Sequence, residues 1–69
     1  MSDNVYKITE VVGTSETSIE DAIRGAVERT AQTVRDIGWF EVIDTRGHVA
    51  DGKVVHFQVT VKIGFHIHD

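Results

Sequence analysis

The sequence predicts an α+β fold with the element order β-α-β-β. Three observations lead to this order: a run of β-branched residues near the N-terminus, a long helical apolar stripe after it, and two alternating segments that flank Asp51-Gly52. These patterns are typical of a strand, an amphipathic helix and a β-hairpin, respectively. The 69 residues contain no linker, repeat or low-complexity stretch. We therefore expect one domain over residues 1–69.

The first strand is expected over Val5–Val12, and the Gly13-Thr14-Ser15 segment that follows is typical of a loop. A helix is then expected from about Ser18 to Ile37. Its apolar residues recur at helical spacing and form one stripe: Ile19, Ala22, Ile23, Ala26, Val27, Ala31, Val34 and Ile37. Gly38 follows as a residue that readily takes the left-handed conformation found just after helices.

The start of this helix has two candidate caps. Thr17 with Glu20 fits a capping box, and Ser18 with Asp21 fits a looser form of the same motif. Within the helix, Gly25 costs up to about 1 kcal/mol relative to Ala. Gly25 is either the result of neutral sequence drift, or it is needed because another backbone approaches the helix closely. The sequence leaves both explanations open.

Two further strands, Trp39–Ala50 and Lys53–Ile67, are expected to form a hairpin, because Asp51-Gly52 favours a type I′ turn. The last strand alternates, and its apolar side chains should face the helix: Val55, Phe57, Val59, Val61, Ile63, Phe65 and Ile67. We expect this strand to lie between the other two and antiparallel to both. The helix would then cover one face of the sheet and leave the other face uncovered.

A two-residue turn pairs Ala50 with Lys53 and thereby sets the register. The expected pairs are Phe40–Ile63 and Val42–Val61 on the core face, and Glu41–Lys62, Ile43–Thr60 and Thr45–Gln58 on the opposite face. The opposite charges of the Glu41–Lys62 pair support this alignment. A bulge at Gly47 would change the phase around it, so the facing of Arg46, His48 and Val49 is left open.

Composition narrows the function classes. A chain this short buries only about 60% of its unfolded surface, and it has no cysteine for disulfides or thiolate metal sites, so oligomerisation is expected to supply the missing stability. With 7 Lys and Arg against 11 Asp and Glu, the net charge of −4 argues against nucleic-acid binding through broad contacts to the phosphate backbone, but not against one local phosphate contact. No apolar run approaches the roughly 20 residues of a membrane span, and no signal peptide is recognisable. We expect a soluble cytoplasmic protein with no membrane partner.

Trp39 is the only tryptophan, and the strand phase directs it away from the helix, onto the face that carries Gln58. It is either a stacking platform for a planar ligand or an anchor between subunits. Gln58 suits the edge of a heteroaromatic ring, or is an ordinary exposed strand residue. Arg46 is either a phosphate or ring contact or a solvated charge.

The remaining candidates give no catalytic or metal site. His66 and His68 are two apart on a strand and share a face, but no second ligand pair accompanies them, so we expect a solvated tail and no metal. No nucleophile–base arrangement, phosphate-binding glycine loop or dinucleotide fingerprint is recognisable. The sequence therefore predicts that the protein is not an enzyme.

Motifs along almost the whole chain resemble the dodecin family, and its bacterial branch in particular. The matching segments are Val5-Tyr6-Lys7, Glu10-Val11-Val12-Gly13-Thr14-Ser15, Ala22-Ile23, Thr33-Val34-Arg35, Trp39-Phe40-Glu41-Val42, Arg46-Gly47, Phe57-Gln58-Val59-Thr60 and Gly64-Phe65. The resemblance implies a three-stranded antiparallel sheet wrapped around one long helix. It also implies a hollow homododecamer whose subunit interfaces hold pairs of flavins.

In this family, the tryptophans that match Trp39 sandwich the flavins, the glutamine that matches Gln58 contacts the isoalloxazine ring, and the arginine that matches Arg46 lies near the flavin. The resemblance implies FMN as the ligand, with riboflavin or FAD as alternatives and coenzyme A as a possible second ligand. It implies flavin storage with quenching by tryptophan. The alternatives are a flavin-dependent redox enzyme and a structural shell with an incidental ligand.

The chain departs from the family pattern at two positions. His66 stands where bacterial members often carry arginine, which weakens the inference of a second cationic contact to phosphate and of coenzyme A binding. Gly38 stands where a larger residue is common, and we expect no effect on the ligand.

Overall fold

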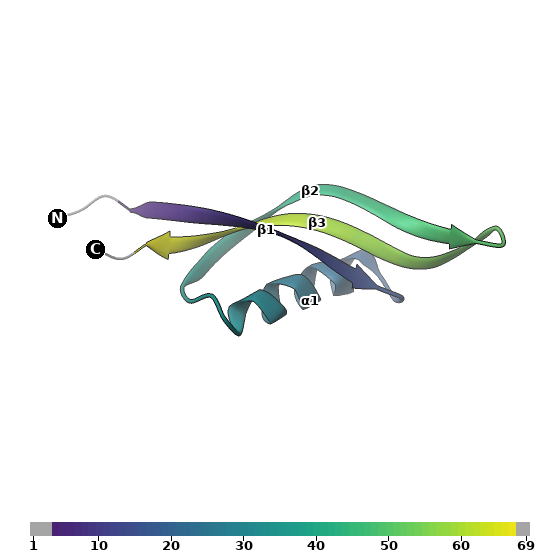
Figure 1. The fold of residues 1–69 in the computed structure, drawn as a ribbon, viewed down its shortest axis with the longest axis horizontal. Coiled ribbons are helices and arrows are strands. Elements are labelled where there is room, and N and C mark those ends of the chain that lie inside the picture. The colour runs from purple at the N-terminus through teal and green to yellow at the C-terminus, as the bar shows by residue number, and fades with distance from the viewer. Residues whose placement is uncertain (1–3, 68–69) are drawn as a thin grey trace.

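The computed structural model describes residues 4–67, which form β1 (Val5–Ser15), α1 (Ile19–Ala31), β2 (Ile37–Ala50) and β3 (Lys53–Ile67) (Figure 1). The strand order is β1-β3-β2, and both neighbours pair antiparallel with β3. The predicted element order and the central place of the last strand are confirmed. The helix lies along one face of the sheet, and both ends of the sheet extend past it (Figure 1). No helix within residues 4–67 is long and apolar enough to cross a bilayer.

β1 is longer than the sequence predicted, and the expected loop at Gly13-Thr14-Ser15 is wrong. These three residues continue the ladder opposite Val59, Gln58 and Phe57. Gly13 is there for close packing and not for a turn, since a Cβ on it would collide with the carbonyl oxygen of Ala22 in α1. The glycine thus allows the end of β1 to approach the helix backbone.

Ser18 caps the helix, so Thr17 is the wrong one of the two candidates. The Ser18 hydroxyl accepts a hydrogen bond from the backbone N–H of Asp21 at 3.0 Å. The buried Ser15 hydroxyl accepts the N–H groups of Thr17 and Ser18 at 2.9 and 3.2 Å and donates to the Asp21 carboxylate at 2.8 Å. These bonds fix the chain between β1 and α1.

The helix ends at Ala31, six residues before the predicted Ile37. The residue with a left-handed conformation is Asp36, at φ 62°, and not Gly38. The segment after Ala31 contains β-branched Thr33 and Val34, which are weak helix formers. Ile37 instead pairs with Phe65 in the sheet, so the apolar stripe continues from the helix into β2.

The hairpin turn has the predicted geometry, because Asp51 and Gly52 both have positive φ, at 54° and 73°. The predicted pairs at the two ends of the hairpin are confirmed: Ala50–Lys53, Phe40–Ile63, Glu41–Lys62 and Val42–Val61. The pairs predicted between them are wrong, since Thr60 faces Asp44 and not Ile43, and Gln58 faces Arg46 and not Thr45.

Two irregularities explain this local shift. One lies between Val42 and Asp44 and inserts Ile43 into β2, and the other lies between His48 and Val49, where β3 carries the additional residue Val55. The two insertions are on opposite strands and cancel, so the register is shifted only between them. Gly47 pairs regularly with Phe57, and the bulge suggested there is wrong.

The core lies where α1 meets the middle of the sheet. Its buried apolar residues are Ala22 and Ala26 of the helix and Val59, Val61 and Ile63 of the central strand. The expected inward apolar set of β3 is confirmed at its centre, but Val55 and Ile67 at its ends are 42% and 40% exposed. The molecule measures 57 × 20 × 13 Å, and its radius of gyration of 14.5 Å exceeds the roughly 11 Å of a compact domain of this length.

Candidate ligand-binding face

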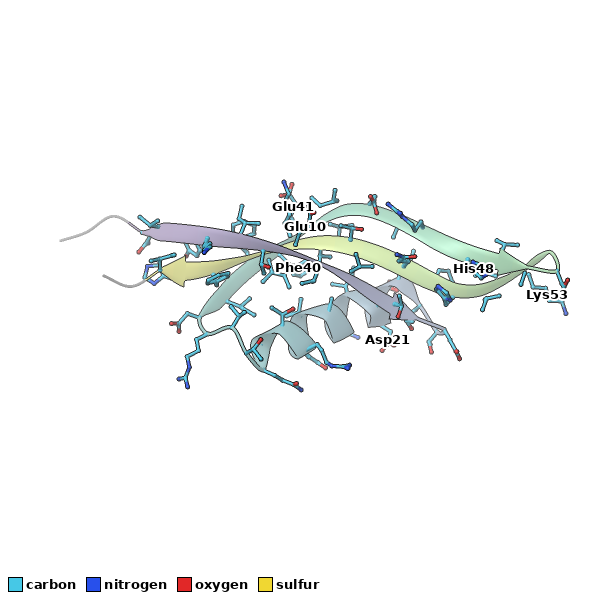
Figure 2. All side chains as sticks on the ribbon, viewed as in Figure 1. Glu10, Asp21, Phe40, Glu41, His48 and Lys53 are labelled. Atoms are coloured by element: carbon cyan, nitrogen blue, oxygen red, sulfur yellow. The ribbon has the colours of Figure 1, made fainter. Side chains whose placement is uncertain are left out.

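The face of the sheet opposite α1 collects the predicted ligand-binding residues, and we call it the outer face. It carries Trp39, Glu41, Asp44, Arg46 and His48 from β2, His56, Gln58, Thr60, Lys62, Gly64 and His66 from β3, and Tyr6, Ile8, Glu10, Val12 and Thr14 from β1. Figure 2 shows Glu10 and Glu41 on this side of the sheet and Phe40 on the side of the helix. No element within residues 4–67 covers the outer face.

The Trp39 ring lies across the neighbouring central strand. Trp39 pairs with Gly64, and a Cβ added to Gly64 would overlap the atoms of the indole. The glycine therefore provides the space in which the ring lies. Trp39 remains 38% exposed, so part of its surface is free for contact. The expectation that this ring points away from α1 agrees with the structure.

Tyr6 extends the aromatic surface, although it was not among the ligand-binding residues predicted from the sequence. Its ring centroid is 6.2 Å from that of Trp39, at 50°, and 5.5 Å from that of His66, at 57°. A Cβ on Gly38 would lie 3.1 Å from the Tyr6 ring, so Gly38 borders this cluster and does not end the helix. The signal available in the sequence was alternation along β1, which assigns Tyr6 to the face opposite Val5 and Lys7.

The Val42–Asp44 irregularity brings Arg46 onto the outer face. Trp39 and Arg46 are seven residues apart, and in a regular strand an odd spacing directs two side chains to opposite faces. The inserted Ile43 changes that phase, so Arg46 lies directly opposite Gln58. All three predicted residues therefore share one face, with Trp39 at one end and the Arg46–Gln58 pair further toward the hairpin turn.

Asp44 modifies the charge that Arg46 presents. Its carboxylate accepts a hydrogen bond from the guanidinium at 3.0 Å, with the two side chains 43% and 60% exposed. The other carboxylate oxygen, Oδ1, is buried and has no hydrogen-bond partner within residues 4–67. Asp44 therefore offsets the positive charge of Arg46 and keeps one acceptor unused. Sequence reasoning missed this residue, because its facing depends on the bulge.

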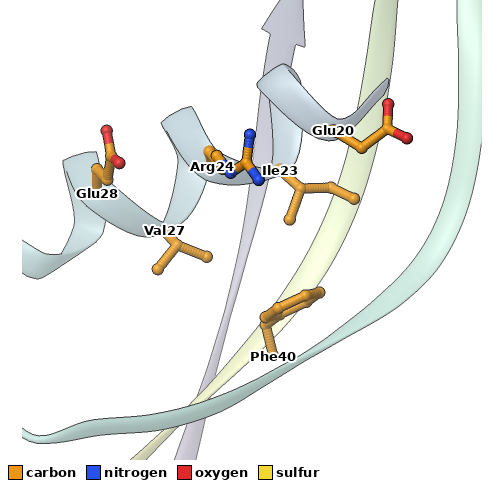
Figure 3. A pocket seen from close by; sticks show the side chains of 6 residues that line it. All are labelled: Glu20, Ile23, Arg24, Val27, Glu28 and Phe40. Carbon is orange, nitrogen blue, oxygen red and sulfur yellow. The ribbon is translucent and has the colours of Figure 1, made fainter. Parts of the chain in front are cut away.

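An apolar hollow lies on the other side of the sheet. It is a cleft of about 420 Å³ between α1 and β2, lined by Ile23, Val27 and Phe40 and edged by Glu20, Arg24 and Glu28 (Figure 3). It contains none of the predicted ligand contacts. The cleft exists because the helix packs mainly against β1 and β3 and leaves Phe40 50% exposed.

The predicted histidine pair at the C-terminus is only partly described. His66 lies on the outer face beside Tyr6, whereas His68 is outside the described residues. Across residues 4–67, no group of three or more His, Cys, Asp or Glu side chains is placed to hold a metal ion.

Comparison with known proteins identifies the family to which this chain belongs. The family model described as Dodecin matches residues 5–68. The chain is 42% identical to the dodecin of Thermus thermophilus over 65 residues, which cover 94% of each chain. The dodecin structure from Streptomyces coelicolor superposes with a TM-score of 0.93 at 48% identity, and the alignment covers 100% of this chain and 99% of that one. The chain belongs to the dodecin family.

A second relative, with a different name, has a lower sequence identity to this chain. The calcium dodecin of Mycobacterium tuberculosis is 32% identical over 62 residues, which cover 90% of this chain and 87% of that protein. The family thus includes a protein named for a cation.

Proposed function

We propose that this dodecin binds flavin on its outer face, with the isoalloxazine ring stacked on Trp39. The observation that carries the proposal is the position of the indole: it lies over Gly64, is partly exposed, and shares its face with Arg46 and Gln58. Aromatic stacking contributes about 0.5–1.5 kcal/mol beyond buried area. The Gln58 amide supplies donors and an acceptor for the polar edge of the ring.

FMN is the proposed ligand, and riboflavin and FAD are the alternatives. A guanidinium makes charge-assisted hydrogen bonds to phosphate, and Arg46 is the cation of the outer face nearest to Gln58 in the strand register. Coenzyme A is a further candidate because it also carries phosphates. His66, in place of the second arginine of bacterial relatives, makes that ligand the weaker proposal.

The site is proposed to form between subunits of a homododecamer. Thirteen large apolar side chains within residues 4–67 are 38–61% exposed, which is typical of a chain that buries surface in an assembly. A two-fold axis brings a residue near its own copy, so Trp39 of two subunits would supply two stacking surfaces. The cleft at Ile23, Val27 and Phe40 is a second surface available for subunit packing.

The proposed role is storage with quenching, and not turnover. A flavin between two indoles leaves little room for a hydride donor, and tryptophan is a good electron donor to an excited flavin. The cytoplasmic location expected from the sequence remains a prediction. The two alternatives, a redox enzyme and a shell with an incidental ligand, differ from storage in measurable ways.

Fluorescence titration of FMN with the purified oligomer tests the proposal. We expect tight binding with nearly complete loss of flavin fluorescence, and Trp39→Ala to weaken binding by at least about 1 kcal/mol per flavin while the oligomer persists. Unchanged affinity in Trp39→Ala would exclude stacking on this residue. Sustained protein-dependent oxidation of NADH or NADPH would instead support the redox enzyme, and weak binding without quenching would support the shell.

A further inference from the structure

The hairpin beyond the helix carries a pair of histidines that the flavin proposal does not use. His48 of β2 and His56 of β3 face each other directly in the register. Their ring centroids are 5.5 Å apart and their planes differ by 15°. No hydrogen bond to either ring is found within residues 4–67. Their ring nitrogens are therefore not engaged by other side chains of this part of the chain.

The surrounding backbone holds the two rings together. The last pair between β1 and β3 is Ser15–Phe57, so the sheet has only two strands at the level of His56. The type I′ turn at Asp51-Gly52 closes this ribbon, and the additional residue Val55 of β3 shifts the register so that His48 faces His56. Figure 2 shows His48 on the part of the hairpin that extends past α1. The two strands thus preorganise the pair, and no other element of residues 4–67 covers it.

We propose that His48 and His56 form a bidentate site for a late first-row divalent metal ion such as Ni²⁺, Cu²⁺ or Zn²⁺. Neutral imidazole is a common ligand for these ions, with metal–nitrogen distances near 2.0–2.1 Å for zinc. Side chains directly opposite in an antiparallel pair have Cβ atoms about 4.5–5.5 Å apart, which allows two imidazoles to converge on one ion. The broad χ2 torsion of histidine allows the exposed His48 ring to turn its nitrogen toward His56.

The nearest positive charge on the outer face is already paired, so it adds little repulsion to a bound cation. The cation one step along the outer face is Arg46, and it is paired with the Asp44 carboxylate at 3.0 Å. Two imidazoles leave the remaining coordination positions of the ion to water or to an external ligand. The site is distinct from the Trp39 end of the outer face, and this proposal does not depend on flavin binding.

Calorimetric titration of the flavin-free, metal-stripped protein with NiCl₂ tests the site. His48→Phe and His56→Phe each keep a stacked ring but remove a ligand, and we expect each to weaken Ni²⁺ binding at least about tenfold, since loss of even an outer hydrogen-bond partner of a metal ligand costs that much. His66→Phe is the matched control and should retain wild-type affinity. Circular dichroism checks that all three variants keep the fold.

Electron paramagnetic resonance of the Cu²⁺ complex gives an independent readout. We expect nitrogen hyperfine coupling in the wild type, reduced in both hairpin variants and retained in His66→Phe. The proposal is overturned if the wild type binds no Ni²⁺, or if His48→Phe and His56→Phe bind as tightly as the wild type. Loss of binding only in His66→Phe would place the ion at the C-terminal end of β3 and would also overturn it.

Discussion

The contact between Trp39 and Gly64 shows how a residue without a side chain determines the position of a proposed ligand surface. The indole lies in the space above Gly64, and any larger residue there would displace it. Tyr6 contacts the same ring from β1 at a centroid distance of 6.2 Å. The orientation of Trp39 is therefore determined by residues from all three strands.

We predict that Gly64→Ala weakens flavin binding almost as much as Trp39→Ala does, because the new methyl group pushes the indole out of its place. Fluorescence titration with FMN measures the loss, and near-ultraviolet circular dichroism reports the changed environment of the single tryptophan. Full FMN affinity in Gly64→Ala would show that the indole position seen in the structure is not the one that binds the ring.

Asp44 and Arg46 provide a prediction about ligand choice. Arg46→Ala should weaken FMN more than riboflavin, since only FMN carries a phosphate. Asp44→Asn should do the reverse and favour FMN over riboflavin by roughly a few-fold, as expected for an exposed ion pair that solvent partly screens. Parallel titrations with the two flavins measure both ratios. Equal changes for both flavins would place Arg46 against the ring or at the subunit interface.

At the scale of the elements, two glycines that look similar in the sequence have opposite roles. Gly13 at the end of β1 has no room for a Cβ, because the carbonyl oxygen of Ala22 and the methyl group of Ala26 occupy that space. A Cβ on Gly25 within α1 would have no heavy atom within 4 Å among the described residues, apart from its chain neighbours and the adjacent backbone of the helix itself. Close approach of this chain's own backbone therefore does not explain Gly25.

These surroundings predict opposite effects on stability. Gly13→Ala should destabilise the protein by about 1–3 kcal/mol through overpacking. Gly25→Ala should stabilise it by up to about 1 kcal/mol, the difference in helix propensity. Guanidinium unfolding at one fixed protein concentration measures both free energies. A destabilising Gly25→Ala would indicate that another subunit packs against this position in the assembly.

At the scale of the whole molecule, the elongated sheet extends well beyond its single helix. The core consists of five buried residues, whereas thirteen large apolar side chains remain exposed on both faces and at both ends of the described chain. A core of this size stabilises an isolated domain only marginally. Folding and assembly are therefore expected to be coupled.

We predict a homododecamer with no folded monomer at ordinary concentrations. Light scattering during size exclusion should give about twelve times the chain mass of 7.7 kDa. The unfolding midpoint should rise with protein concentration, because association contributes to the measured stability. A folded species of 7.7 kDa would contradict this prediction.

Patterns in the sequence were sufficient to predict the element order, the type I′ turn at Asp51-Gly52, the central place of the last strand and the common face of Trp39 and Gln58. These features follow from signals that act between close neighbours, namely turn chemistry and the period of two in a strand. Three features became visible only in the folded chain: the end of the helix at Ala31, the inserted Ile43 that turns Arg46 to the outer face, and the place of the indole over Gly64. Each of these features depends on contacts between residues that are distant in the sequence. Ile37, for example, pairs with Phe65 in the sheet and does not form another helical turn. The periodicity of a single segment contains no information about such contacts.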